Sequence, residues 1–402
     1  MKKSVLAAAI AALIAAPTGA ALADDVKVGA LMGITGPLAN FIPPILNAAK
    51  LAEADVNAGG GILGGQNFVL VVADGQAAAQ PSVDAASKLV NLENVAAIMG
   101  ALSSGATIAS ANAVSIPNNV LQVSPTATSP AVTDIEDNDY LYRIVPSDNY
   151  QGQVLANIVL DEGINKVAVA YVNNDYGVGI ANTFKKAFED KGGTVTAFEK
   201  HEDKKNSYRG ELATLASSGA DALVVIAYAG GSGAKIVKQS LENGFFDRFI
   251  GTDGLRDDLL IEQVGPEALS TSFFSSPTSP AENAVADALH KRFDETYGEG
   301  SDKPFVDQTY DATMLIALAI EKAGSTDREA VKAALREVAN APGEVVGPGE
   351  WAKAVKLIGE GKDINYEGAA GSHEFDGNGD VAGFIGKFVV DGDSYKQIAV
   401  FE

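Results

Sequence analysis

The chain of 402 residues contains no cysteine and only three histidines. Without cysteine it can form no disulfide, carry no catalytic thiol and attach no lipid to a cysteine after a leader. The histidines are dispersed, and the segment His201-Glu-Asp-Lys-Lys205 lacks the second histidine of a zinc protease helix. We therefore predict a protein that holds no metal and uses no cofactor.

The glycine-rich motifs of nucleotide-binding proteins and serine hydrolases are also missing. No G-x-x-x-x-G-K-[ST] loop occurs, and Gly231-Ser-Gly233 lacks the third glycine of a dinucleotide turn. Gly230-Gly-Ser-Gly-Ala234 departs from G-x-S-x-G at its last position. The segment Asp376 to Asp380 matches the first half of a calcium-binding loop. Val381 replaces the glycine that such a loop requires, so we expect a plain turn there.

Charge and hydropathy indicate an exported protein. The formal net charge of -22 argues against nucleic acid and anionic lipid as partners. Two lysines, the apolar run Val5–Ala16 and the small residues of Ala21-Leu-Ala23 are typical of a signal peptide. We predict a signal peptide over residues 1–23, cleavage before Asp24 and a periplasmic location. The run is too short to span a membrane, and no later run is longer, so direct membrane insertion is not expected.

Strands and helices alternate along the mature chain, beginning with a strand at Val26–Met32 and a helix over Ile45–Asn57. One such series precedes Pro146 and another follows it, which favours an α/β fold of two doubly wound, Rossmann-like lobes. We expect residues 342–364 to be irregular and the last strand to be Phe384–Val390.

Two short apolar strands end in hydroxyl-rich loops. Val95–Met99 precedes a loop with Ser103 and Ser104, and a second strand precedes a loop with Thr126 and Thr128. A helix-length segment between the strands suggests a parallel pair, whose carboxyl ends share the edge where α/β sheets bind ligands. The serines could take a carboxylate and the threonine loop an ammonium. The alternative is that these residues are ordinary helix caps and turn residues.

Several motifs together resemble the periplasmic leucine/isoleucine/valine-binding proteins. They are Ile34-Thr-Gly-Pro-Leu-Ala-Asn-Phe41, Asn57-Ala-Gly-Gly-Gly-Ile-Leu-Gly-Gly65, Ser124-Pro-Thr-Ala-Thr-Ser-Pro130, Asn174-Asp-Tyr-Gly177, Tyr228-Ala-Gly-Gly231 and Thr309-Tyr-Asp-Ala312. The resemblance implies a type I periplasmic binding fold with three crossover segments, near Pro146, Ser275–Pro280 and Gly379–Gly383. It places residues 24–146 and 277–380 in lobe 1, and residues 147–276 and 381–402 in lobe 2.

The same resemblance implies a function. A monomer would close on an amino acid, most simply a branched-chain or other apolar one, and deliver it to the membrane permease of an ABC transporter. Ser104 and the backbone N–H of Thr128 would hold the ligand carboxylate, with Ser103 in support. The Thr126 carbonyl, the Thr128 hydroxyl and Asp253 would hold the ammonium. Asp253 could instead be a helix N-cap.

Aromatic residues at matching positions would enclose the ligand side chain, although each could equally be a core residue. They are Phe41, Tyr176, Tyr228 and Phe305. Arg256 and Asp307 lie beside matched positions, and either would favour a polar ligand if it faced the cleft. A polar or aromatic amino acid, an amide, urea or an aromatic acid is therefore an alternative ligand. Rival functions are an exported hydrolase using Asp253 and Asp307, and a sensor that docks to a chemoreceptor.

Overall fold

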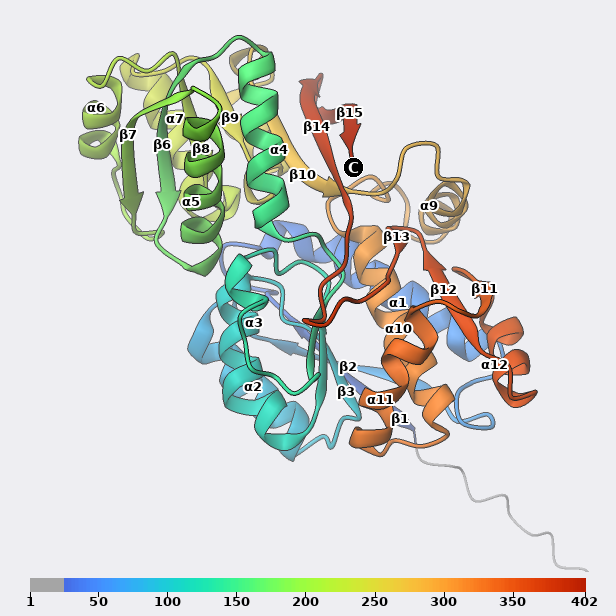
Figure 1. Cartoon of the computed structure of the whole chain (residues 1–402). Helices are drawn as coiled ribbons and strands as arrows, with labels where there is room; N and C mark the ends of the chain where they lie inside the picture. The colour runs from blue at the N-terminus through green and yellow to red at the C-terminus, as the bar shows by residue number, and fades with distance from the viewer. Residues whose placement is uncertain (1–24) are drawn as a thin grey trace, which may run out of the picture.

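A computed structural model describes residues 25–402, so the predicted signal peptide and its cleavage point lie outside the described residues. The described chain forms two α/β lobes, each built on its own sheet (Figure 1). None of the helices in residues 25–402 has the length and hydropathy that crossing a membrane requires.

The sheet of the first lobe has five parallel strands in the order β2-β1-β3-β4-β5. Their bounds are β1 (Val26–Met32), β2 (Phe68–Asp74), β3 (Ala97–Gly100), β4 (Leu121–Ser124) and β5 (Leu141–Arg143). The strands β1, β3, β4 and β5 are largely buried on both faces, whereas the edge strand β2 is only partly buried. Met32 packs in the core that contains α1 (Ile42–Ala58) and α10 (Val306–Ala323). Leu31 faces the other way, toward α2 (Ala79–Asn91) and α3 (Ser104–Ser110).

The sheet of the second lobe has seven strands in the order β15-β14-β10-β9-β8-β6-β7. The strands from β10 to β7 pair in parallel, and the edge hairpin of β14 and β15 is antiparallel. The bounds are β6 (Lys166–Val172), β7 (Thr194–His201), β8 (Ala222–Ile226), β9 (Phe249–Gly251), β10 (Phe273–Thr278), β14 (Phe384–Asp391) and β15 (Ser394–Phe401). The helices are α4 (Asp148–Asp161), α5 (Asp175–Asp190), α6 (Arg209–Ala216), α7 (Ala234–Asn243) and α8 (Asp258–Val264).

The prediction that residues 342–364 are irregular is wrong. They form β11 (Glu344–Val346), the helix α12 (Trp351–Gly359) and the start of β12 (Ile364–Gly368). Trp351 anchors α12, because its ring is buried and its Nε1 donates to the carbonyl of Gly61 at 3.0 Å. That contact links residues 290 positions apart, so it leaves no local signal in the sequence. The remaining elements are α9 (Ala284–Tyr297), α11 (Arg328–Ala339) and β13 (Gly371–Ser372).

The chain passes between the lobes three times, after β5, after β10 and between β13 and β14 (Figure 1). The second passage differs from our prediction, because Ser275 to Thr278 continue β10 and pair with β14. The last strand, β15, was not predicted. Three of its four exposed positions carry polar residues and its other positions are only partly buried, so its hydrophobic signal is weak.

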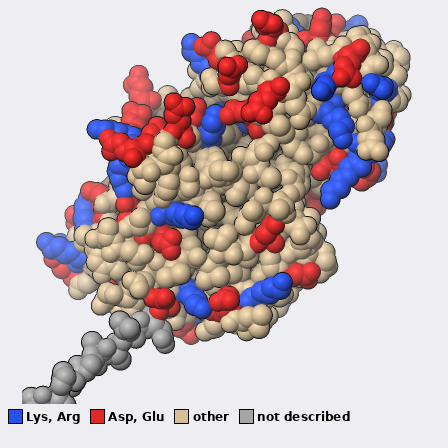
Figure 2. All heavy atoms as spheres, turned by 180° about the vertical axis from the view of Figure 1, so that it is seen from behind, with Lys and Arg blue, Asp and Glu red and all other residues tan. Residues whose placement is uncertain are grey.

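Charged side chains are distributed over both lobes on the face that Figure 2 shows, with acidic and basic residues interspersed. Among the described residues many charged side chains pair at the surface, such as Lys185 with Glu189 at 2.5 Å and Lys303 with Asp258 at 2.7 Å. On this face the acidic excess is therefore spread and does not form one continuous patch.

Candidate functional site

A cavity lies between the lobes where the carboxyl ends of both sheets meet. Its walls come from residues that are far apart in the sequence and include seven of the nine residues that we predicted for the site. The lining residues are Leu38, Phe41, Ile45, Leu102, Ser104, Thr126, Tyr176, Tyr228, Asp253, Gly254 and Phe305. The two predicted residues outside this lining are Ser103 and Thr128.

The first-lobe side of the cavity presents hydroxyl and backbone donors. Ser104 opens α3, and its hydroxyl oxygen accepts a hydrogen bond from the backbone N–H of Ser129 at 3.2 Å. The hydroxyl proton of Ser104 is then free to be donated into the cavity. The backbone N–H of Thr128 makes no backbone hydrogen bond within residues 25–402. These two donors suit an anionic oxygen such as a carboxylate.

The other hydroxyls of the two loops mostly hold the loops in place. Thr126 donates its hydroxyl to the carbonyl of Leu102, and Ser103 donates to the carbonyl of Ala77 at 2.9 Å. The hydroxyl of Thr128 is buried and has no hydrogen-bond partner in the described structure. Thr128 does not line the cavity, so its hydroxyl is not exposed to that space in the described structure.

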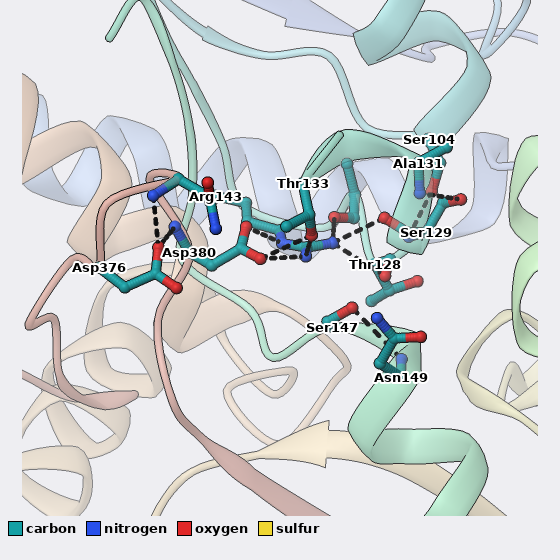
Figure 3. Close-up of polar contacts among 12 residues, drawn as sticks. Ser104, Thr128, Ser129, Ala131, Thr133, Arg143, Ser147, Asn149, Asp376 and Asp380 are labelled. Atoms are coloured by element: carbon teal, nitrogen blue, oxygen red, sulfur yellow. Dashed lines mark hydrogen bonds and ion pairs between the residues drawn. The ribbon is translucent and has the colours of Figure 1, made fainter. Parts of the chain in front are cut away.

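Arg143, on β5, fixes the threonine loop from behind (Figure 3). Its side chain is fully buried, and Nη1 donates to the carbonyls of Thr128 at 2.9 Å and Ser129 at 2.8 Å. On its other side, Nε and Nη2 donate to the two carboxylate oxygens of Asp380 at 2.7 and 2.6 Å. Asp380 lies between β13 and β14, in the third passage between the lobes. Arg143 thus connects the predicted ligand loop to an interlobe segment.

The second-lobe side of the cavity presents a carboxylate. Asp253 follows β9, and its Oδ1 accepts hydrogen bonds from Gln151 Nε2 and Tyr176 Oη, both at 3.0 Å. Burial raises the pKa of Asp253, and the two hydrogen bonds oppose that rise. No side-chain ion pair of Asp253 exists among the described residues, so an entering cation would find an uncompensated acid.

Sequence reasoning missed Asp148 and Gln151, which stand in the first turn of α4 beside this acid. Asp148 is fully buried, and its two carboxylate oxygens have no hydrogen-bond partner in the described structure. Burial and the charge of Asp253 raise the pKa of Asp148, while the Thr128 hydroxyl and the charge of Arg143 oppose that rise. An aspartate in the first turn of a helix is common because it complements the helix dipole, so nothing in the sequence marks Asp148 as a site residue.

Aromatic and aliphatic side chains form the rest of the cavity. Tyr176 and Tyr228 stack with ring centroids 5.1 Å apart, and the backbone N–H of Gly254 donates to the Tyr176 hydroxyl at 3.1 Å. Phe305 has a left-handed backbone (φ 68°) at the start of α10, and Phe41 precedes α1. This part of the wall is suited to an apolar group.

Arg256 and Asp307 do not line this cavity. The guanidinium of Arg256 lies over the ring of Phe388, 3.8 Å from its centroid. Asp307 accepts hydrogen bonds from His290 at 2.7 Å and from Ser279. The two carboxylates that the rival hydrolase would use are therefore not brought together at the cavity.

The arrangement combines a donor side, a carboxylate side and an apolar wall in one enclosed space. The polar groups and the apolar wall match the parts of a zwitterion with an apolar substituent, and the lobes must open to admit one because the cavity volume is about 20 Å³.

Comparison with known proteins gives matches over almost the whole described chain. A family model described as periplasmic binding protein matches residues 25–355. The Leu/Ile/Val-binding protein BraC3 of Rhizobium johnstonii is 30% identical over 344 residues, which cover 83% of this chain and 89% of that protein.

Two crystal structures show the same architecture. The leucine binding protein LivK from Thermotoga maritima superposes with a TM-score of 0.79 at 26% identity, covering 93% of this chain and 98% of that one. LivJ from Streptococcus pneumoniae, a branched-chain amino acid transporter substrate binding protein in complex with isoleucine, has a TM-score of 0.77 at 25% identity. The coverage is 94% of this chain and 98% of that one.

Proposed function

The chain belongs to the periplasmic binding protein family, and from that premise we propose that it captures an amino acid with an apolar side chain and delivers it to the permease of an ABC transporter. One observation carries the proposal. Ser104 of the first lobe and Asp253 of the second lobe line one cavity whose remaining wall is largely aromatic and aliphatic, and the backbone N–H of Thr128 makes no backbone hydrogen bond among the described residues.

The polar groups on the two sides of the cavity determine which end of the ligand each side binds. Ser104 and the Thr128 N–H take the α-carboxylate, while Asp253, the Thr126 carbonyl and the Thr128 hydroxyl take the α-ammonium. Charge-assisted hydrogen bonds contribute roughly 1.5–3 kcal/mol each. Micromolar affinity corresponds to about -8 kcal/mol, so a few such bonds with apolar burial are sufficient after the costs of ordering.

The apolar wall favours a branched-chain side chain over a polar one. Phe41, Tyr228 and Phe305 contribute aromatic surface, and Leu38, Ile45 and Leu102 contribute aliphatic surface. Arg256 lies outside this wall, so it does not offer its charge to a polar side chain there. Isoleucine bound to LivJ and the names of LivK and BraC3 support the same ligand class.

The two lobes close over the ligand when it binds. Residues 25–146 and 279–380 move as one body and residues 147–278 and 381–402 as the other, since β10 extends to Thr278 in the second-lobe sheet. Because Ser104 and Asp253 belong to different lobes, a ligand that contacts both stabilises the closed form. The permease recognises that form, and the ligand leaves chemically unchanged, without catalytic turnover. The site of action is the periplasm, after cleavage before Asp24.

Titration calorimetry of ligand-stripped protein tests the proposal. Leucine, isoleucine and valine are expected to bind near one to one, while urea and benzoate are not. Ser104→Ala is expected to weaken leucine binding about 10- to 100-fold, since it removes one charge-assisted hydrogen bond. Binding of urea or benzoate in preference to every amino acid would refute the assignment, and release of a cleaved product would support the hydrolase.

The closure of the two lobes leads to a second prediction, which concerns Gly230 in the segment Ala229–Gly233 of the second lobe. A Cβ added there would lie 2.7 Å from the backbone carbonyl oxygen of Pro37, in the first lobe. Gly230→Ala is therefore expected to hold the lobes apart and to weaken leucine binding about 10- to 100-fold, from an overpacking cost of about 1–3 kcal/mol.

Gly210→Ala is the matched control, because a Cβ at that position of the same lobe meets nothing within 4 Å. It should leave the dissociation constant unchanged. If Gly230→Ala also binds leucine like the unmodified protein, the close approach of Gly230 to Pro37 is not part of the ligand-bound state.

A further inference from the structure

A second cavity lies between the lobes beside the one described above, and Phe41 lines both of them. Its volume is about 380 Å³. The first lobe contributes the start of α1 and the segment between α9 and α10 to its walls. The second lobe contributes residues 256–258 and Tyr395 of β15. Because both lobes form the walls, this cavity is complete only when the lobes are together.

Arg256 lines the second cavity and has no partner for its charge. Only 6% of the residue is exposed. It forms no ion pair and donates no side-chain hydrogen bond among residues 25–402. One face of the guanidinium lies over the ring of Phe388, so the N–H groups at its edge are the part that a ligand can pair with. Buried charges in proteins are rarely left unpaired, so this arginine indicates a missing anion.

The other charged groups around the second cavity do not supply that anion. Lys303, the other cation in the lining, already pairs with Asp258 at 2.7 Å, and this pair bridges the lobes. Glu299 and Asp302 are exposed, so solvent and salt screen their charges. Burial raises the pKa of Asp257, which favours its neutral form. None of these acids forms an ion pair with the guanidinium in the described structure.

The guanidinium keeps its positive charge near neutral pH. Burial lowers the pKa of Arg256 to about 10, which is still well above the pH of the periplasm or of an ordinary buffer. A planar guanidinium binds the two oxygens of a carboxylate through parallel N–H donors. A carboxylate is therefore the anion that suits this position.

Much of the remaining wall suits an apolar body. Aromatic and proline side chains of the first lobe form it, and they are Phe41, Pro43, Pro44, Phe293, Tyr297 and Pro304. Burial of an aliphatic group against such a surface is favourable by roughly 25 cal/mol per Å² of apolar area. A charged edge and an apolar wall in one cavity match a small aliphatic carboxylate.

We propose that the second cavity binds a small aliphatic carboxylate on Arg256, and that this carboxylate strengthens the binding of the amino acid in the first cavity. Both cavities have walls from both lobes, so both molecules stabilise the same closed form. Such coupling is reciprocal, so the amino acid raises the affinity for the carboxylate by the same factor. The second site goes beyond the proposed function, and only the coupling rests on it.

Calorimetry with isovalerate tests the proposal. Isovalerate is a branched carboxylate without an ammonium group, and isovaleramide is its uncharged control of nearly the same shape. Leucine is titrated into ligand-stripped protein alone, with isovalerate and with isovaleramide, at one ionic strength. We expect isovalerate near saturation to raise the affinity for leucine at least about fivefold. Isovaleramide should not change it, and leucine-saturated protein should bind isovalerate near one to one.

Arg256→Met is expected to abolish the effect of isovalerate. Leucine affinity without isovalerate should stay unchanged, because Arg256 does not line the first cavity. The substitution leaves no buried partner unpaired, so the structure should be kept. Arg248→Met is the control, since Arg248 is another second-lobe arginine with an unpaired Nε, but it donates to Glu162 at 3.1 Å outside the second cavity. This variant should keep the full effect of isovalerate.

The outcomes separate the two proposals. Weaker leucine binding in isovalerate would mean that it competes for the first cavity, and an unchanged affinity would mean that the sites are not coupled. Either result overturns the inference, as does an equal effect in Arg256→Met or with isovaleramide, and each leaves the proposed function standing. A failure of leucine to bind without isovalerate overturns the proposed function instead. Isovalerate binding that is lost in Arg256→Met would then still support the second site.

Discussion

Arg143→Met is expected to lower the free energy of unfolding by about 3–5 kcal/mol, because it leaves a buried carboxylate without its partner. The Arg143 side chain is fully buried and that of Asp380 is 14% exposed. The substitution also removes the donors to the carbonyls of Thr128 and Ser129. Urea unfolding measured at neutral pH gives the change, and leucine binding should weaken because the ligand loop loses its support.

Arg248→Met is the matched control for this prediction. Arg248 pairs with Glu162 at 3.1 Å, but the two side chains are 30% and 36% exposed. Exposed pairs contribute about 0–1 kcal/mol, so the control should change little. A loss of less than about 1 kcal/mol for Arg143→Met would mean that the network of Figure 3 does not hold the loop.

The fold and the centre of the site could be predicted because their signals are local. Apolar runs such as Val95–Met99 mark buried parallel strands, and parallel strands end at one edge of the sheet. Ser104 and Thr126, which follow neighbouring strands, therefore line the same cavity. For the same reason the residues of the first-lobe half of the site could be predicted from the order of the strands alone.

The remaining features depend on contacts between distant segments. Asp148 has an ordinary place in the sequence, and only its burial beside Asp253 makes it unusual. Gln151 and its partner Asp253 are 102 positions apart. Arg256 could not be oriented from the sequence, since the ring of Phe388 that it covers lies on β14, which joins the sheet near the end of the chain.

The second large effect is expected at Asp253, where asparagine should abolish leucine binding and yet stabilise the ligand-free protein. Asparagine has nearly the same shape, and its carbonyl can accept the hydrogen bonds from Gln151 and Tyr176. The loss of its charge weakens binding by at least about 100-fold, since a buried charge-assisted contact is removed. Calorimetry measures this loss.

The gain in stability follows from the raised pKa of Asp253. Between the ordinary carboxyl pKa near 4 and the raised value, the folded protein binds more protons at this site than the unfolded chain does. Stability therefore falls as the pH rises through that interval, by about 1.4 kcal/mol for each unit of the rise. Asparagine removes this loss, so Asp253→Asn should be about 1–3 kcal/mol more stable at pH 8, with the difference vanishing below about pH 4.

Unfolding curves at pH 4 and pH 8, without ligand, distinguish this effect from a simple packing change. A packing change would shift stability equally at both pH values, whereas the charge effect is present only at the higher one. Asp161→Asn, at an exposed position of α4, should change neither curve. If Asp253→Asn is instead less stable than the unmodified protein at pH 8, the ionised carboxylate does not destabilise the ligand-free protein. The acid at position 253 would then be explained by its contribution to stability and not by ligand binding.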